Sequence, residues 1–266
     1  MGCMTPAERA SAVAFALKNC ALEAMAPGDA TMRAAADYEA GRIDVAGLID
    51  VADDETAQTV GRGRLVDGSL DDHARDRAAS VFARTVLLVE RPWRATGDLD
   101  ELTAIHKGLF AGVFDDAGRL RTSDTTRGVT DDTALARNPE AFFPAALIET
   151  GALNIATELA EARNLQALDR GVFAHRLAHV YDELGYLHPF RGGNGMTLRM
   201  FASRLAHDAG WDIDWGPVTR ESYKEAKRAA FRGDTSGFER MFASLIGPAN
   251  PTRVFLIAGF EQGPAH

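Results

Sequence analysis

The sequence predicts an all-α protein, and three observations support this fold class. Apolar residues recur at helical spacing in most parts of the chain, and proline or glycine interrupts the chain between these segments. Only one short stretch, residues 119–128, favours extended structure. With 266 residues, 46% of them hydrophobic and 25% charged, the chain can bury the core of one large domain, or of one domain and a small module. We therefore expect helices that pack on one another, with one short β element.

The first helix has a clear start signal. Thr5 can cap the helix, Pro6 fits its first turn, and Glu8 stands three residues after the cap. Pro27 and Gly28 should stop this helix. The N-terminal region is alanine-rich and too small to fold stably alone. Its three helices are expected at residues 5–25, 30–40 and 45–52.

The rest of the chain alternates helical patterns with polar or glycine-containing breaks. Residues 53–72 show weak apolar periodicity and are expected to form a linker and the start of the next helix. Residues 119–128, with glycine at both ends, are expected to form a short hairpin or an extended loop, and residues 210–217 a loop. The remaining helices are expected at residues 73–90, 99–114, 145–162, 171–185, 196–209, 221–231 and 236–245.

Charge and composition exclude several classes of function. The net charge of −9 argues against a nucleic-acid partner bound by broad phosphate neutralisation, although a nucleotide needs only a local pocket. Cys3 and Cys20 are too few for a disulfide framework. No apolar run has the length of a membrane span, and the N-terminus lacks a secretory signal. We therefore expect a cytoplasmic protein, or a delivered effector, with no membrane partner.

Residues 188–199 carry the most information about function. His188 precedes a glycine-rich turn, and a helical pattern follows at once. Such a turn presents backbone N–H groups at a helix N-terminus, which is a ready site for an anion. His188 could take a proton from an attacking group because its unperturbed pKa lies near neutral pH, although a lone histidine before Pro-Phe is more often structural. The cluster of glycines favours close approach of the backbone to a phosphate group.

This segment, HPFRGGNGMTLR, resembles the signature of the Fic family, HPFx[D/E]GNGRxxR, at seven of its nine specified positions. Residues 104–122 also resemble the Fic segment that leads into a flap hairpin, and the likeness extends over roughly residues 65–245. The resemblance implies a Fic fold, which is a helical bundle with a short β-hairpin flap. It also implies transfer of AMP from ATP, as substrate, to a hydroxyl side chain of a target protein of unknown identity.

The resemblance assigns a role to individual residues. His188 would be the general base that deprotonates the target hydroxyl. An anion hole for the α- and β-phosphates would be formed by Gly193, Asn194 and Gly195, and Arg199 would face the terminal phosphate. Phe190 would pack inward and hold the loop. The flap that pairs with the target backbone would include Arg121, Thr122, Ser123 and Asp124.

Two positions depart from the Fic signature. Gly192 replaces the Asp or Glu that holds Mg²⁺ and offers no side-chain ligand, so no metal ligand is expected here. Met196 replaces an arginine that stabilises phosphate charge. Three hypotheses therefore remain: a weak AMP transferase, a transferase of another phosphate-linked group, and a protein that binds a nucleotide or partner without chemistry. Arg191 and Arg204 are candidates to replace the lost charge in part.

Residues 5–52 resemble the small helical antitoxins that block Fic enzymes through the motif [S/T]xxxE[G/N]. The matching stretch has Glu23 in place, with Asn19 at the Ser/Thr position and Ala24 at the Gly/Asn position. The resemblance implies that Glu23 pairs with Arg199 and fills the space of the γ-phosphate. The alternative is a solvated glutamate on a helix face.

The expected domain organisation follows from these two resemblances. Residues 1–55 would form an antitoxin-like inhibitory module, and residues 56–266 the Fic domain. Toxin-like and antitoxin-like parts would then share one chain, which makes the inhibitory helix an intramolecular partner at high effective concentration. The sequence leaves open whether the protein also forms a homo-oligomer.

Overall fold

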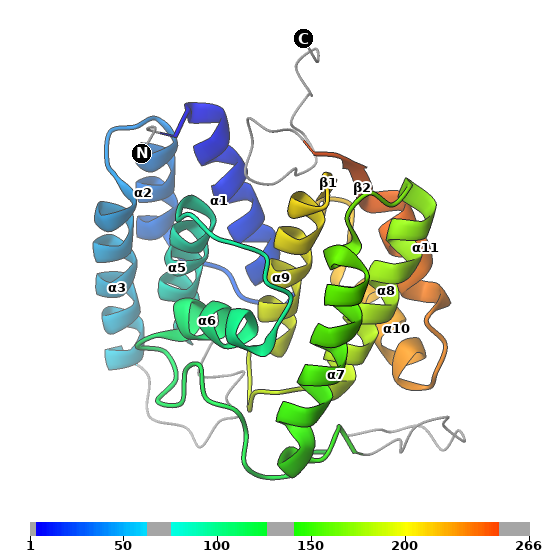
Figure 1. Cartoon of the computed structure of the whole chain (residues 1–266). Helices are drawn as coiled ribbons and strands as arrows, with labels where there is room; N and C mark the ends of the chain where they lie inside the picture. The colour runs from blue at the N-terminus through cyan, green and yellow to red at the C-terminus, as the bar shows by residue number, and fades with distance from the viewer. Residues whose placement is uncertain (1–3, 63–75, 127–140, 250–266) are drawn as a thin grey trace.

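The computed structural model describes residues 4–62, 76–126 and 141–249. Within these residues the chain is helical apart from loops and one two-stranded sheet, which confirms the all-α prediction (Figure 1). In the same residues, no helix is both long enough and apolar enough to span a bilayer.

The first three helices are α1 (Pro6–Ala21), α2 (Asp29–Glu39) and α3 (Val45–Arg62). The start of α1 has the expected capping box. The Glu8 N–H donates to the Thr5 hydroxyl at 3.3 Å, and the Thr5 N–H donates to the Glu8 carboxylate at 2.6 Å. Two of the N–H groups that the helix start leaves unpaired are thereby satisfied, and Pro6 has no N–H to pair.

The predicted linker at residues 53–72 is wrong over residues 53–62, because α3 continues to Arg62. Polar residues of α3 face α5 (Ala78–Glu90) rather than water. The Asp53 carboxylate accepts hydrogen bonds from the hydroxyl of Ser80 and the guanidinium of Arg84, both at 2.6 Å. A helix that meets its neighbour through hydrogen bonds lacks the apolar stripe on which the prediction relied. The rest of the predicted linker, residues 63–72, lies outside the described residues.

The remaining helices follow the predicted order, and α9 lies at the centre of them (Figure 1). It contacts α6 and α8 and also touches α1, and nearly all of its residues are buried. This central position fixes the start of α9 relative to several elements at once. The bounds are α6 (Leu99–Phe110), α7 (Ile148–Glu161), α8 (Arg170–Leu187), α9 (Asn194–Asp208), α10 (Arg220–Phe231) and α11 (Ser236–Leu245), with short 3₁₀ turns at Ala145–Leu147 and Arg163–Leu165.

The one sheet is not where the sequence predicts a β element. Strands β1 (Trp211–Ile213) and β2 (Ile246–Pro248) pair antiparallel, with Ile213 opposite Ile246, although residues 210–217 were expected to form a loop. Of the expected hairpin at 119–128, residues 119–126 contain only an isolated bridge between Thr126 and Ala141, and residues 127 and 128 lie outside the described part. Pairing between segments so far apart in sequence leaves no local signal.

The N-terminal helices share the core of the rest of the chain. Both α1 and α3 pack on α5, and the buried apolar cluster runs without a break from Phe15 through Phe82 and Phe110 to Phe201. The predicted boundary after residue 55 falls inside α3. The structure therefore joins the first three helices to the bundle through apolar packing, and their independence as a module stays a prediction.

Candidate active site

The candidate site is built around the loop that joins α8 to α9. The α8 helix ends at His188, whose backbone is left-handed (φ 45°, ψ 61°) and whose N–H donates to the Leu184 carbonyl at 3.2 Å. The buried guanidinium of Arg121 holds this end: its Nε donates to the His188 carbonyl at 2.7 Å, and its Nη2 to the Leu187 carbonyl at 3.3 Å. The last carbonyls of α8 thus have partners despite the strained turn.

The four residues assigned to the flap divide into one buried and three exposed side chains. Arg121 is 3% exposed, and its N–H also donates to the Pro189 carbonyl at 2.9 Å. Its guanidinium contacts the Ser123 and Phe143 carbonyls as well. Thr122, Ser123 and Asp124 are exposed, and Asp124 accepts from the Ala145 N–H at 2.7 Å. The side chain of Arg121 therefore anchors this segment, and pairing of the segment with a target stays a prediction.

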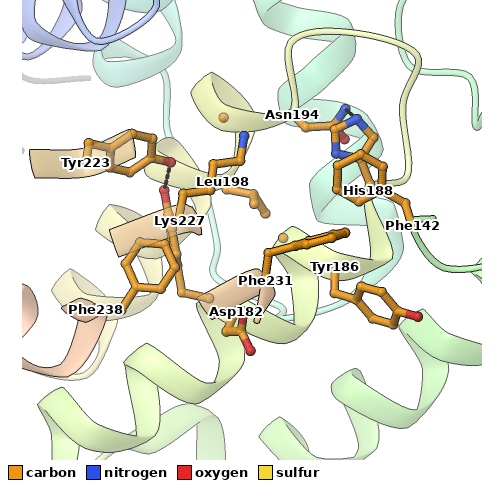
Figure 2. Close-up of a pocket in the computed structure, with 13 residues that line it drawn as sticks. Phe142, Asp182, Tyr186, His188, Asn194, Leu198, Tyr223, Lys227, Phe231 and Phe238 are labelled. Atoms are coloured by element: carbon orange, nitrogen blue, oxygen red, sulfur yellow. Dashed lines mark hydrogen bonds between the residues drawn. The ribbon is translucent and has the colours of Figure 1, made fainter. Parts of the chain in front are cut away.

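The ring of His188 is held between two side chains (Figure 2). Phe142 stacks on it with ring centroids 3.9 Å apart, and Asn194 Nδ2 lies 3.1 Å from His188 Nε2. The same Asn194 amide closes a ring with Phe190, accepting from its N–H at 3.0 Å and donating to its carbonyl at 2.7 Å. These two bonds fix the orientation of the amide, so its NH₂ group faces the histidine. His188 Nε2 is therefore the acceptor and carries a lone pair, as a base requires.

The first turn of α9 faces the cleft beside His188. Gly193 caps the helix with φ at +73°, and a Cβ atom there would collide with the Phe110 ring. The first helical hydrogen bond runs from the Thr197 N–H to the Gly193 carbonyl at 3.1 Å. The N–H groups of Asn194, Gly195 and Met196 consequently have no partner within the helix, and they provide the positive end of its dipole. The side chain of Asn194 is occupied with the loop, so only its N–H is available to an anion.

A second histidine, which the sequence analysis did not assign to the site, holds the glycine loop through a hydrogen bond to its backbone. His106 of α6 is 1% exposed, and its Nδ1 accepts from the Gly118 N–H at 2.8 Å. Its Nε2 must therefore carry the proton, which it donates to the Gly192 carbonyl at 3.0 Å. Burial lowers the pKa of His106 to about 4, and the neutral ring stacks on Phe190 at 3.9 Å. The signal for this role was a polar residue on the apolar face of the predicted helix 99–114.

Arg199 lies on α9 one turn after this loop, and it contacts the N-terminal helix. Its Nη2 donates to the Glu23 carboxylate at 2.8 Å, and its Nε donates to the Asn19 side-chain oxygen at 2.7 Å. The guanidinium also lies over the Tyr223 ring, 5.0 Å from the centroid. The Nη1 atom is buried and has no hydrogen-bond partner among the described residues. The expected Glu23–Arg199 contact is therefore present, and one buried guanidinium nitrogen has no hydrogen bond among the described residues.

The turn after α1 brings Glu23 to the start of α9. Ala24 has φ at +57°, which explains why glycine or asparagine suits this position of the motif. A Cβ atom on Gly195 would collide with the Glu23 carboxylate, so this glycine permits the close approach. Burial alone would raise the pKa of Glu23, but the charges of Arg199, Lys227 and Arg220 outweigh it and hold the pKa below its usual value. Glu23 is thus an ionised partner of the site.

The two departures from the Fic signature are visible in the loop. Met196 is 1% exposed, and Gly192 supplies only a carbonyl that His106 already occupies. In the described parts of the chain, no group of three or more His, Cys, Asp or Glu side chains could hold a metal ion. The loop therefore offers no side-chain ligand at the position where the signature holds Mg²⁺, and the metal dependence of the chain stays a prediction. The suggestion that Arg204 compensates is wrong, because its Nη2 donates to the Leu88 carbonyl at 3.1 Å, away from the loop.

The loop borders two connected spaces of different character. A polar cleft of about 340 Å³ lies over the start of α9, and it is lined by Glu23, Met25, Phe110, His188, residues 191–196, Arg220, Lys224 and Lys227. An apolar pocket lies on the other side of His188 and is lined mainly by aromatic rings, including Phe142, Tyr186, Tyr223, Phe231 and Phe238 (Figure 2). Both spaces are lined by His188, Asn194, Gly195 and Lys227. The arrangement suits a ligand with an anionic part and a flat apolar part.

Comparison with known proteins agrees with this geometry. The family model described as the Fic/DOC family matches residues 96–206. The protein adenylyltransferase VbhT of Bartonella schoenbuchensis is 36% identical over 169 residues, which is 62% of this chain and 33% of VbhT. The probable protein adenylyltransferase Fic of Salmonella typhimurium is 35% identical over 154 residues, covering 58% of this chain and 72% of that protein. The chain thus spans about a third of VbhT and most of the shorter relative.

Solved structures show the same fold. BepC, a VirB-translocated effector of Bartonella tribocorum with bound AMPPNP, superposes with a TM-score of 0.57 at 25% identity, covering 64% of this chain and 84% of BepC. An N-terminal Fic domain of Bartonella quintana with bound ADP gives 0.57 at 26% identity, covering 65% of this chain and 83% of that domain. The signature segment from His188 to Arg199 leads into the central helix α9, and the Salmonella typhimurium relative is matched over 72% of its length. This chain therefore belongs to the Fic/DOC family.

Proposed function

We propose that this chain transfers AMP from ATP to a hydroxyl side chain of a target protein. The observation that carries the proposal is the placement of His188 Nε2, which lies against the Asn194 amide beside the open N-terminus of α9. Relatives named protein adenylyltransferases, and related structures with AMPPNP or ADP bound, support ATP as the substrate.

The proposed site binds the nucleotide by its two ends. The anion hole assigned to residues 193–195 would bind phosphate oxygens, because the N–H groups of Asn194 and Gly195 have no partner within the helix and lie at its positive end. Nη1 of Arg199 is a buried donor without a partner in the described residues, and it suits the terminal phosphate. The aromatic pocket beyond His188 offers the base a flat apolar surface.

The proposed reaction is one displacement at phosphorus. The target hydroxyl oxygen attacks the α-phosphorus, and the hydroxyl proton moves to His188 Nε2. The bond from the α-phosphorus to the oxygen that bridges it to the β-phosphate breaks, and pyrophosphate leaves with the electron pair. The N–H groups of the loop hold the negative charge on the α-phosphate, so positioning and charge neutralisation supply the rate enhancement.

We further propose that Glu23 inhibits the site. Its carboxylate occupies one edge of the Arg199 guanidinium and lies against Gly195, so a terminal phosphate would compete with it for charge and space. Asn19 supports the same contact through two hydrogen bonds to Arg199, at 2.7 and 3.1 Å. The inhibitory element and the inhibited site would then belong to one chain, as in a fused toxin–antitoxin pair.

The test of transfer is the intact mass of the protein and of added candidate targets after incubation with ATP. Wild type should gain, or transfer, the mass of one AMP, and His188→Ala should give none while unfolding at the same temperature within a few degrees. His179→Ala is the matched control, because His179 lies on α8 beside Glu158 and away from the loop. Equal transfer by wild type and His188→Ala would remove His188 as the base.

Gly192 and Met196 favour a second candidate, a diverged Fic protein. Such a protein would bind nucleotide or a partner without chemistry, or transfer another phosphate-linked group. Nucleotide binding without a mass change supports the first form, and a mass gain other than that of AMP supports the second. A delivered effector would agree with the VirB-translocated protein among the structural relatives. The same mass measurement identifies the target protein, because a candidate target that is modified gains the mass of the transferred group.

A further inference from the structure

A row of cations on α10 faces the glycine loop across the polar cleft. Arg220, Lys224 and Lys227 stand at positions i, i+4 and i+7 of α10, which places them on one face of the helix. All three line the cleft that the start of α9 also lines. The acidic residues Glu221 and Glu225 of the same helix do not line it. The row is therefore directed at the space where the phosphates are proposed to bind.

Cations outnumber carboxylates in the lining of the cleft. The lining holds one carboxylate, that of Glu23, and four cationic side chains. Glu23 is bound to Arg199, Arg191 pairs with Asp116 at 3.3 Å, and the charges of Lys227 and Arg220 act on the Glu23 carboxylate. The chain as a whole has a net charge of −9, so the cluster of cations at this cleft is a local feature. A cleft lined by cations raises the local concentration of anions.

Arg220 also has a polar atom without a partner. Its Nε is buried and forms no hydrogen bond in the described residues. Burying a guanidinium donor without a partner costs free energy, which a bound anion would recover. The cleft that this side chain lines has the volume for several phosphate oxygens.

We infer that Arg220, Lys224 and Lys227 form a pyrophosphate subsite that neutralises the β- and γ-phosphates without a divalent cation. The inference rests on the proposed function for the identity of the leaving group. The subsite supplies from α10 the positive charge that the loop lacks, since Gly192 holds no metal ligand and Met196 is no cation. The negative charge that develops on the leaving pyrophosphate would be stabilised by these three cationic side chains.

The experiment measures binding of inorganic pyrophosphate, ATP and AMP to the full chain by calorimetry, in EDTA and in Mg²⁺. Wild type or Glu23→Gly should bind pyrophosphate in EDTA. The triple variant Arg220→Gln, Lys224→Gln, Lys227→Gln should bind pyrophosphate and ATP at least about tenfold more weakly and AMP about as before. Arg228→Gln is the matched control, an exposed cation of α10 that does not line the cleft.

Several outcomes overturn the inference. It fails if neither wild type nor Glu23→Gly binds pyrophosphate in EDTA, or if Arg228→Gln weakens binding as much as the triple variant. Because Lys224 is exposed, Lys224→Glu should keep the fold and still weaken pyrophosphate binding, which guards against a misfolded triple variant. These binding measurements do not depend on AMP transfer. They can therefore refute the pyrophosphate subsite without refuting the proposed transfer of AMP, and the reverse.

Discussion

At the scale of single residues, two histidines of the same site have opposite tasks because their surroundings differ. His188 is half-buried, and its Nε2 accepts from an amide, which leaves a base at the edge of the cleft. His106 is fully buried, and both of its nitrogens are used by backbone groups. The sequence analysis assigned only His188 to the site, and the partners of the two rings in the structure distinguish a proposed base from a residue that positions the loop.

Protonation of His106 should destabilise the fold as the pH falls. Its pKa is about 4 in the folded chain and about 6.5 when exposed, so the unfolded state binds the proton first. The contribution of His106 to the free energy of unfolding is fully present above pH ~6.5, and it should decrease by up to ~3 kcal/mol as the pH falls toward 4. Denaturant unfolding of wild type and His106→Leu across this range measures it. The free-energy gap between the two proteins should narrow toward low pH, and a constant gap would contradict the assignment.

At the scale of elements, the site is a junction of helix ends. The C-terminus of α8, the N-terminus of α9 and the turn after α1 meet within a few residues of the loop. Helix ends supply unpaired backbone groups and dipole charge, so such a junction can bind an anion with little side-chain chemistry. Small changes at these ends should therefore alter binding more than changes along the helices.

Glu23→Gly should raise nucleotide affinity or transfer rate, because it frees the Arg199 edge that now contacts the carboxylate. Removing one carboxylate from a site for a polyphosphate should strengthen ATP binding by about tenfold, and AMP binding much less. Calorimetry measures the change in ATP affinity, and mass spectrometry measures the change in transfer rate. Asp50→Ala removes an exposed carboxylate of α3 as a control. If Glu23→Gly behaves as wild type, the first helices stabilise the bundle without inhibiting it.

The double change Gly192→Glu, Met196→Arg should create Mg²⁺-dependent AMP transfer, most clearly with Glu23→Gly. Glutamate would offer the metal an oxygen ligand, and arginine a phosphate contact. The two effects should not be additive, because both act on one bound triphosphate. Transfer assays with Mg²⁺ or EDTA check this. A repaired chain that binds ATP with Mg²⁺ and modifies nothing would show that the pocket has diverged beyond these positions.

At the scale of the whole molecule, the Glu23–Arg199 contact, which we propose to be inhibitory, is connected to the core. α1 packs on α5 and touches α9, so the residues that hold Glu23 in place also bury apolar surface. An element that contributes to a shared core is held near its site even when the contact itself is weak. Release of Glu23 is therefore easier to achieve by a local change in the turn after α1 than by removal of the helix.

Deleting residues 1–44 should destabilise the protein rather than simply activate it. The deletion removes Phe15, Leu22 and Tyr38 from the core and exposes the surface of α5 that α1 covers. Each large buried side chain contributes roughly 2 kcal/mol, so the loss approaches the whole stability of a domain. Thermal unfolding and size-exclusion chromatography compare the truncated chain with Glu23→Gly. A truncated monomer with the unfolding temperature of wild type would establish the first helices as a separate module.

The sequence alone determined the features that depend on neighbours along the chain. Helical spacing and the capping residues after Thr5 predicted the helices, since a helix is stabilised by contacts three and four residues apart. The order of His188, the glycines and Arg199 predicted a turn followed by a helix for the same local reason, and anion binding by this loop stays a prediction. The antitoxin-like motif even named the pair Glu23–Arg199, although it treated Asn19 as a mismatch that the structure shows bound to Arg199.

Only the tertiary structure decided what depends on partners far along the chain. The length of α3 follows from polar contacts with α5, the pairing of β1 with β2 from strands that start 35 residues apart, and the burial of Arg121 from carbonyls of α8. The cation row of α10 lines the same cleft as the loop because α10 packs on α8 and α11. Such contacts are fixed by packing and charge in three dimensions, and no local pattern of residues encodes them.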